Sequence, residues 1–239
     1  MIATFTALIF AHVLADFVLQ TSAMVKHKRA PRVMALHTAI VLLTAQATTG
    51  QIAAPELLLL TAAHLIIDCI KIYGGFRNFT AFLVDQTAHV ATIAALASFA
   101  PTLWATGAWA AHPWMLPAMA LLTGLIVTLT AGQHAIALLM RPHAMRIRNN
   151  GLRDGGRQIG LLERGLIFVF ILTNLPVAVG FLIAAKSVLR FGTASRDQRT
   201  AEYVIIGTLA SFGWAILAAL ATQAALGHLP PLEIAPVAP

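Results

Sequence analysis

Residues 64–89 read HLIIDCIKIYGGFRNFTAFLVDQTAH. His64 and Asp68 are four residues apart, and so are Asp85 and His89, in the reverse order. A spacing of four places two side chains on one face of a helix. If a turn joins two antiparallel helices here, the two aspartates lie at one depth and the two histidines lie about one turn away. The stretch therefore predicts a polar site built between helices.

The composition of the whole chain is that of a membrane protein. Of its 239 residues, 59% are hydrophobic and 10% are charged, and the mean hydropathy is +0.80. Because a membrane span needs ~20 apolar residues, we expect an all-α, polytopic transmembrane helix bundle of about eight spans. The expected spans are 2–20, 33–49, 56–73, 79–100, 114–140, 161–175, 176–190 and 201–226.

The basic residues indicate how the spans are oriented. With the N-terminus outside, all 16 Lys and Arg residues fall on one side of the predicted bundle. By the positive-inside rule, that side is the cytoplasm. The net charge of +7 and the pI near 10.5 are thus explained by topology and by attraction to lipid head groups, and no nucleic-acid partner is expected. Cys69 is the single cysteine, which excludes an intramolecular disulfide.

An internal repeat is predicted within the first 100 residues. Three ionisable positions recur at a constant offset of 52 residues, because His12, Asp16 and His37 align with His64, Asp68 and His89. Each repeat contains two spans, so the two hairpins are expected to be parallel, with a pseudo-twofold axis along the membrane normal.

Four regions are expected along the chain. The first is a four-helix His/Asp region at 1–100, with repeats at 1–50 and 53–100. The second, at 101–158, contains an aromatic outside loop, the fifth helix and a basic cytoplasmic loop. The C-terminal helices at 159–228 and a disordered tail at 229–239 follow. The aromatic loop, with Trp104 and Trp109, is typical of a membrane interface. Within 161–190, the turn signal at 173–176 favours a hairpin of two short helices over one long span.

The ionisable residues inside the spans are the candidate site. A charge at the bilayer centre costs ~2.5–3.5 kcal/mol, so such residues usually face a cavity and have a function. Imidazoles and carboxylates together suit Zn, Mn or Fe, as one ion or two. The candidate metal ligands are His12, Asp16, His37, His64, Asp68, Asp85 and His89. A metal-free proton relay and a purely structural hydrogen-bond network are the alternatives. Gln20 and Gln86 are expected either to orient the aspartates or to form interhelical hydrogen bonds.

A second group of charges lies near predicted cytoplasmic helix ends. Lys186 and Arg190 are four residues apart and are candidates to bind an anionic group such as phosphate. The alternative is a structural ion-pair network in which Glu163 or Glu202 neutralises them.

Several motifs resemble those of a known family. HVLADFVLQ, HLIIDCIK and FLVDQTAH, followed by LLERGLIF, KSVLRF and EYVIIGTLASF, resemble a family of bacterial integral membrane proteins defined only as a domain of unknown function. The resemblance implies a multi-pass protein of the bacterial inner membrane and supplies no reaction. A looser similarity links the chain to membrane-bound metal-dependent hydrolases, although their His-Arg and Thr-His signatures are missing here.

Two classes of function follow from these patterns. The first is a membrane-embedded metal-dependent enzyme, a hydrolase that acts on a lipid-linked or amphiphilic substrate at the cytoplasmic leaflet. Asp85 is the expected general base, because the equivalent position of the first repeat is Val33. The alternative is a transporter or channel for divalent metal or protons. A structural membrane subunit is a third possibility.

Overall fold

The protein is helical throughout the part that its structure describes. The computed structural model describes residues 1–144, 154–194 and 198–231, and within these ranges it leaves out the side chains of 144 and 189–194. These ranges contain no strand, so the predicted all-α fold is confirmed for them. The helices are α1 (Ile2–Leu14), η1 (Ala15–Leu19), α2 (Ser22–His27), α3 (Pro31–Thr49), α4 (Pro55–Tyr73), α5 (Phe79–Phe99), α6 (Met115–Ile126), η2 (Val127–Ala131), α7 (Gly132–Ala144), α8 (Gly155–Leu172), α9 (Pro176–Ala194) and α10 (Gln198–Leu226).

Four helical stretches have the length and apolar composition needed to cross a membrane. They are Ile2–Leu19, Phe79–Phe99, Met115–His143 and Gln198–Leu226. Further predicted spans coincide with α3, α4, α8 and α9, which are shorter or less apolar over their described residues; α9 is apolar over Pro176–Val188. In α4, for example, Glu56, Asp68 and Lys71 interrupt the apolar sequence. Association with a membrane thus fits the structure, while the number of eight spans and the internal repeat stay predictions.

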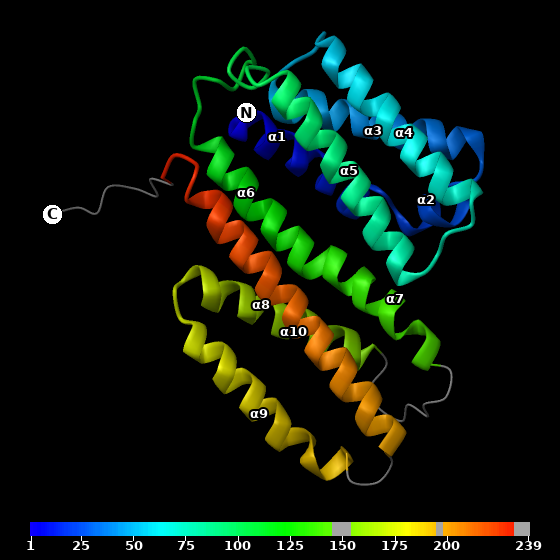
Figure 1. Ribbon diagram of the computed structural model, residues 1–239, viewed down its shortest axis with the longest axis vertical. Helices are drawn as coiled ribbons and strands as arrows, with labels where there is room; N and C mark the ends of the chain where they lie inside the picture. Colours follow the sequence, from blue (N-terminus) through cyan, green and yellow to red (C-terminus); the bar gives the residue numbers. More distant parts are fainter. Residues whose placement is uncertain (145–153, 195–197, 232–239) are drawn as a thin grey trace, which may run out of the picture. The chain divides into compact units, whose positions relative to one another are not determined.

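The chain divides into two compact units. The first comprises residues 1–126 and 225–239, and the second comprises residues 127–224. In the first unit, α1 packs against α3, α5 and α6, and α4 packs against α3 and α5 (Figure 1). The apolar core between these helices includes Leu8, Leu57 and Ile93. The predicted boundaries at 100 and 158 stay predictions, and most of the predicted tail, 232–239, lies outside the described residues.

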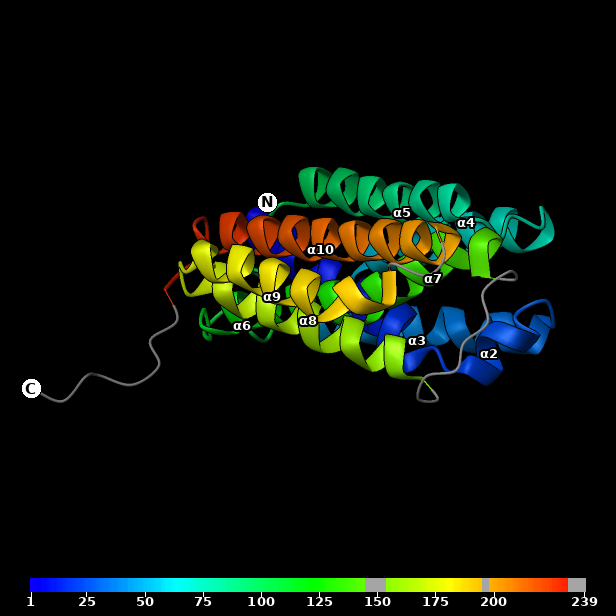
Figure 2. The ribbon, with the colours of Figure 1, turned by 90° about the horizontal axis from the view of Figure 1, so that it is seen from below.

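The first unit has two ends that differ in chemistry. In Figures 1 and 2, α2 and the turn at 74–78 lie at one end, which we call the α2 end, whereas Met1 and residues 101–113 lie at the other. At that other end, the Thr4 hydroxyl donates to the Pro101 carbonyl at 3.0 Å and accepts from the Trp104 amide at 3.2 Å. Trp104 is only 4% exposed, so it belongs to the core and not to the interfacial belt expected from the sequence.

Local sequence signals set the limits of the helices around the site. Pro31 begins α3, where its fixed φ suits the first turn and its missing N–H costs nothing. α3 ends at Gly50, which has φ +67°, and a Cβ there would lie 2.7 Å from the Ala108 nitrogen. Asn78 caps α5 by accepting a hydrogen bond from the Ala81 amide at 2.7 Å. These signals fix the register in which the site residues face one another.

The second unit packs α8, α9 and α10 around an apolar core. Ile167 and Phe168 of α8 pack with Phe212 and Ala215 of α10. α8 ends at Leu172 and α9 begins at Pro176, so the break expected at 173–176 is present. Whether this hairpin crosses a membrane twice stays a prediction.

Two π-helical turns interrupt helices that the sequence predicts to be regular. η1 directly follows α1 and contains Asp16, and η2 separates α6 from α7. A π turn inserts an extra residue and is often found at functional sites. No residue pattern in the sequence indicated either of them.

Candidate metal centre

The four predicted histidines form one buried layer in the first unit. The ring centroids are 4.2 Å apart for His64 and His89, 4.9 Å for His12 and His89, 5.4 Å for His37 and His64, and 5.6 Å for His12 and His64. Each of these side chains is at most 5% exposed. Four different helices, α1, α3, α4 and α5, therefore contribute to one imidazole cluster.

The three predicted aspartates lie one turn closer to the α2 end. Asp16 and Asp68 follow their histidines by four residues on chains running toward that end, and Asp85 precedes His89 by four on the chain running away from it. On the other side of the histidines, the residues four positions away are apolar and buried. These residues are Leu8, Val41, Leu60 and Ile93. The order from the α2 end is thus carboxylate, imidazole, hydrocarbon.

Four donor atoms converge within this cluster. They are Nε2 of His37, Nε2 of His64, Oδ1 of Asp16 and Oδ2 of Asp68. The two nitrogens are 3.3 Å apart, and each nitrogen lies 3.3–3.5 Å from both oxygens. In a regular tetrahedron with metal–ligand distances of ~2.0–2.1 Å, ligand atoms are roughly 3.3–3.4 Å apart. These five nitrogen–nitrogen and nitrogen–oxygen separations match the edges of a tetrahedral coordination shell.

One carboxylate oxygen of this quartet lacks the hydrogen bond that a buried oxygen normally has. Oδ1 of Asp16 is buried and accepts no well-aligned hydrogen bond, whereas Oδ2 of Asp68 is buried with the Lys28 ammonium group 2.7 Å away. Buried polar atoms almost always have a partner, and a missing partner is often an ion. Buried groups that could hold a metal ion include His37, His64 and Asp68, and also His12, Asp16 and His64.

The remaining three predicted ligands present a second set of unpartnered atoms. His89 Nδ1 donates to the Asp85 backbone carbonyl at 2.8 Å, which leaves its Nε2 with a lone pair. His12 Nε2 donates to the Gln86 side-chain oxygen at 3.2 Å, which leaves Nδ1 with a lone pair. Both lone-pair nitrogens, together with Oδ1 of Asp85, are buried without a hydrogen-bond partner. A hydrogen bond from the far ring nitrogen is how proteins orient metal-binding imidazoles.

The two glutamines contact histidines across helices. The Gln20 side-chain amide lies 3.0 Å from Nδ1 of His37, so the end of η1 is joined to α3. Gln86 bonds to His12 and also donates to Oδ2 of Asp85 at 3.1 Å. Interhelical hydrogen bonding, one of the two expected roles, is therefore present for both. Orientation of an aspartate is present for Gln86.

Two lysines, which the sequence did not indicate as site residues, contact the aspartates of the cluster. Nζ of Lys28 lies 2.7 Å from Oδ2 of Asp68, and Nζ of Lys71 lies 2.5 Å from Oδ2 of Asp85. Lys28 is only 6% exposed. Because it lies in a run of basic residues between predicted spans, it was assigned to the cytoplasmic surface by charge alone. Its burial depends on how the end of α2 packs against α4, which sequence periodicity does not show.

The family comparison covers the unit that contains this site. Residues 4–116 match the family described as Protein of unknown function (DUF3307). All seven candidate ligands lie within the matched range. The motifs LLERGLIF, KSVLRF and EYVIIGTLASF lie beyond it, and the comparisons show no similarity to metal-dependent hydrolases. No curated protein and no solved structure matches the chain.

The second group of predicted charges lies in the second unit. Nζ of Lys186 is 2.6 Å from Oε2 of Glu163 and 4.9 Å from the ring centre of Phe212. This ammonium group is thus already paired with a carboxylate, as in the structural alternative. The side chain of Arg190 lies outside the described residues. The role of this pair in binding an anion stays a prediction.

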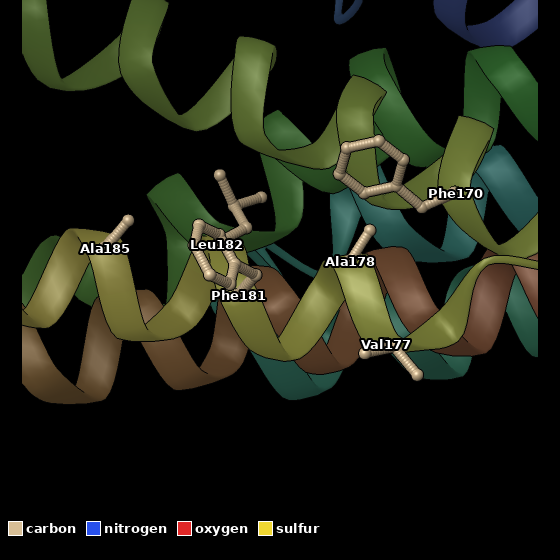
Figure 3. Close-up of a pocket in the computed structure, with 6 residues that line it drawn as sticks. All are labelled: Phe170, Val177, Ala178, Phe181, Leu182 and Ala185. Atoms are coloured by element: carbon tan, nitrogen blue, oxygen red, sulfur yellow. The ribbon is translucent and has the colours of Figure 1, made fainter.

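An apolar hollow of about 460 Å³ lies between α8 and α9 (Figure 3). Phe170 of α8 and five residues of α9, among them Phe181 and Leu182, line it. No titratable or nucleophilic side chain is among its lining residues, so these residues provide no catalytic or metal-binding group.

Proposed function

We propose that the protein is a membrane-embedded, metal-dependent hydrolase. The observation that carries this proposal is the quartet of donor atoms from His37, His64, Asp16 and Asp68, whose nitrogen–nitrogen and nitrogen–oxygen separations of 3.3–3.5 Å suit a tetrahedral divalent ion. Zn, Mn and Fe all accept two imidazoles and two carboxylates. His12, His89 and Asp85 would complete the environment or hold a second ion.

Asp68 is the ligand that leaves most easily in this arrangement. Its Oδ2 is shared with the Lys28 ammonium group at 2.7 Å, which competes for the same lone pairs. Catalytic zinc sites hold the ion with three protein ligands and leave one position to water or substrate. With Asp68 held by Lys28, the residues His37, His64 and Asp16 would form such a three-ligand set. An ion held there would supply a Lewis acid and a water with a lowered pKa.

Asp85 is positioned to act as the general base. Lys71 and Gln86 both bond to Oδ2, which orients the carboxylate. Oδ1 is buried and accepts no hydrogen bond, so it remains able to accept a proton from a water in the cluster. Asp68, Asp85 and His89 offer ligand atoms within 4.8 Å of one another, which places Asp85 beside the shared aspartate.

The substrate is proposed to be lipid-linked or amphiphilic and to enter from the α2 end. Beyond the histidines, the buried layer of Leu8, Val41, Leu60 and Ile93 offers no polar group along a path. Beside it, a cavity lined partly by His12, His64 and His89 has a volume of about 10 Å³, close to the minimum for one water molecule. These features favour a one-sided site over the alternative of a metal or proton channel. By the positive-inside rule and the resemblance, the site faces the cytoplasm from the bacterial inner membrane.

Metal analysis of the protein purified in detergent tests this proposal. We expect one or two divalent ions per chain, retained through size-exclusion chromatography, and a thermal unfolding midpoint that falls when a chelator removes them. The metal-loaded protein should hydrolyse an amphiphilic ester or phosphoester probe in mixed micelles, and the stripped protein should not. Metal-free protein with unchanged unfolding in chelator would remove the proposal.

A further inference from the structure

The lysines at the α2 end of the His/Asp cluster point to the class of substrate. Lys28 and Lys71 each pair with a different aspartate, and those aspartates offer oxygens within 4.8 Å of each other. The side chain of Lys28 is 7% exposed, whereas that of Lys71 is 28% exposed, so the pair extends from the buried cluster toward the surface. Both lie on the side of the cluster away from the apolar layer.

Backbone contacts hold Lys28 in this position. Lys28 is the C-terminal cap of α2, and the next residue, Arg29, is joined to the end of α4. The Arg29 guanidinium donates to the Ile72 carbonyl at 3.4 Å, and the Tyr73 hydroxyl donates to the Arg29 carbonyl at 3.3 Å. The ammonium group is thus directed at the cluster by the fold, and it is not a loosely placed surface charge.

The charge balance changes sign when a metal binds. Asp16, Asp68 and Asp85 with Lys28 and Lys71 have a net charge of −1 if the histidines are neutral. A divalent ion changes this to +1, while the two ammonium groups remain beside Asp68 and Asp85. A buried net charge is unfavourable without a counter-ion, so the loaded site needs an anion beside both lysines.

We propose that Lys28 and Lys71 bind the phosphate group of the substrate, with one phosphate oxygen at the metal position that Asp68 vacates. This proposal rests on the metal-dependent function proposed above. Lysine binds phosphate as a point charge, and a metal–lysine pair is suited to a tetrahedral oxyanion. The site would accept either a free phosphate or the phosphate head group of a lipid. It differs from the site expected at Lys186 and Arg190, because Lys186 is paired with Glu163 in the second unit.

Titration calorimetry with inorganic phosphate tests the proposal on metal-loaded and metal-stripped protein. We expect binding only to the loaded form, weakened about 10- to 100-fold by Lys28→Met or Lys71→Met. Lys28→Arg and Lys71→Arg should retain most of the binding. The exposed Lys26, on the same short helix, provides the matched control Lys26→Met, which should change nothing.

A parallel measurement separates the two sources of phosphate. In mixed micelles, a lipid with a phosphomonoester head group should bind to the loaded protein more tightly than a neutral lipid does. If the phosphomonoester lipid binds selectively, if this binding needs Lys28 and Lys71, and if inorganic phosphate binds weakly, the substrate is a lipid. If inorganic phosphate binds tightly and the lipid shows no selective binding, the ligand is free phosphate.

Two outcomes would overturn the proposal and are distinguishable. If the protein holds stoichiometric metal and binds neither phosphate probe, or binds them equally well in the methionine variants, the lysines are counter-ions only and the metal centre stands. If no metal binds, both the metal centre and the phosphate site are wrong.

Discussion

At the scale of single residues, Gln86 orients two candidate ligands at once. Its side-chain oxygen accepts from His12 and its amide nitrogen donates to Asp85. We expect Gln86→Ala to weaken binding of the second ion, beside His12 and His89, about 10- to 100-fold, as loss of such supporting hydrogen bonds does in other metal sites. Competition with a fluorescent chelator measures the affinity. Gln51→Ala is the matched control, because Gln51 bonds to Leu103 and Thr106 at the opposite end of the unit. Equal affinity in the two variants would contradict the role of Gln86.

Asp85 provides a second prediction at this scale. Asp85→Asn keeps the shape of the side chain but removes the proton acceptor, so turnover of a hydrolysable probe should fall about 10²- to 10⁴-fold. Metal content should remain near that of the unchanged protein, since the quartet does not include Asp85. Glu56→Gln, at a half-buried position in the first turn of α4, should leave turnover unchanged. Loss of metal together with activity would show that Asp85 is a ligand and not the base.

Some residues of the cluster can be predicted from the sequence, and others cannot. His64 and Asp68 are detectable because helical periodicity relates positions four apart, and an ionisable residue stands out in an apolar span. Lys28 and Lys71 were missed because a lysine near a helix end is the usual signal of topology. Only the contacts between the residues after α2 and the end of α4 distinguish a buried ammonium group from a surface one, and those contacts have no local sequence signature.

At the scale of elements, the π turn η2 depends on one buried arginine. Nε of Arg164 donates to the Thr128 carbonyl at 2.9 Å, Nη2 to the Leu129 carbonyl at 3.2 Å and Nη1 to the Ser211 hydroxyl at 3.1 Å. A π turn changes the pattern of backbone hydrogen bonds along a helix. The Arg164 guanidinium donates hydrogen bonds to two carbonyl groups within η2 itself.

Replacing Arg164 should therefore destabilise the second unit. Arg164→Leu leaves buried carbonyls without a donor, and we expect a loss of about 3 kcal/mol or more in the free energy of unfolding. Arg157→Leu, on the exposed face of the same helix, should change it by less than about 0.5 kcal/mol. Denaturant unfolding in detergent micelles measures both. Similar losses in the two variants would show that Arg164 does not support η2.

At the scale of the whole molecule, the topology makes its own prediction. The helix limits can be predicted from hydropathy, because a span has a characteristic length. The side of the membrane that each loop faces is predicted only from the distribution of Lys and Arg, and the helix packing does not test it. In a Cys69→Ser background, Arg77→Cys should react with an impermeant maleimide only after the cytoplasmic side is opened. Ala105→Cys should react from outside in intact cells. Both positions are exposed, so burial does not confound the labelling. Labelling of both from one side would contradict the predicted spans.

Anomalous X-ray diffraction at the absorption edge of the bound element tests the metal centre. We expect a peak enclosed by His37, His64, Asp16 and Asp68, with nitrogen and oxygen ligands at ~2.0–2.2 Å. A second peak beside His12, His89 and Asp85 would identify a two-ion site, expected at roughly 3.5–4 Å from the first. A map from active protein with no anomalous peak in this cluster, or with its peaks only at surface histidines, would contradict the account.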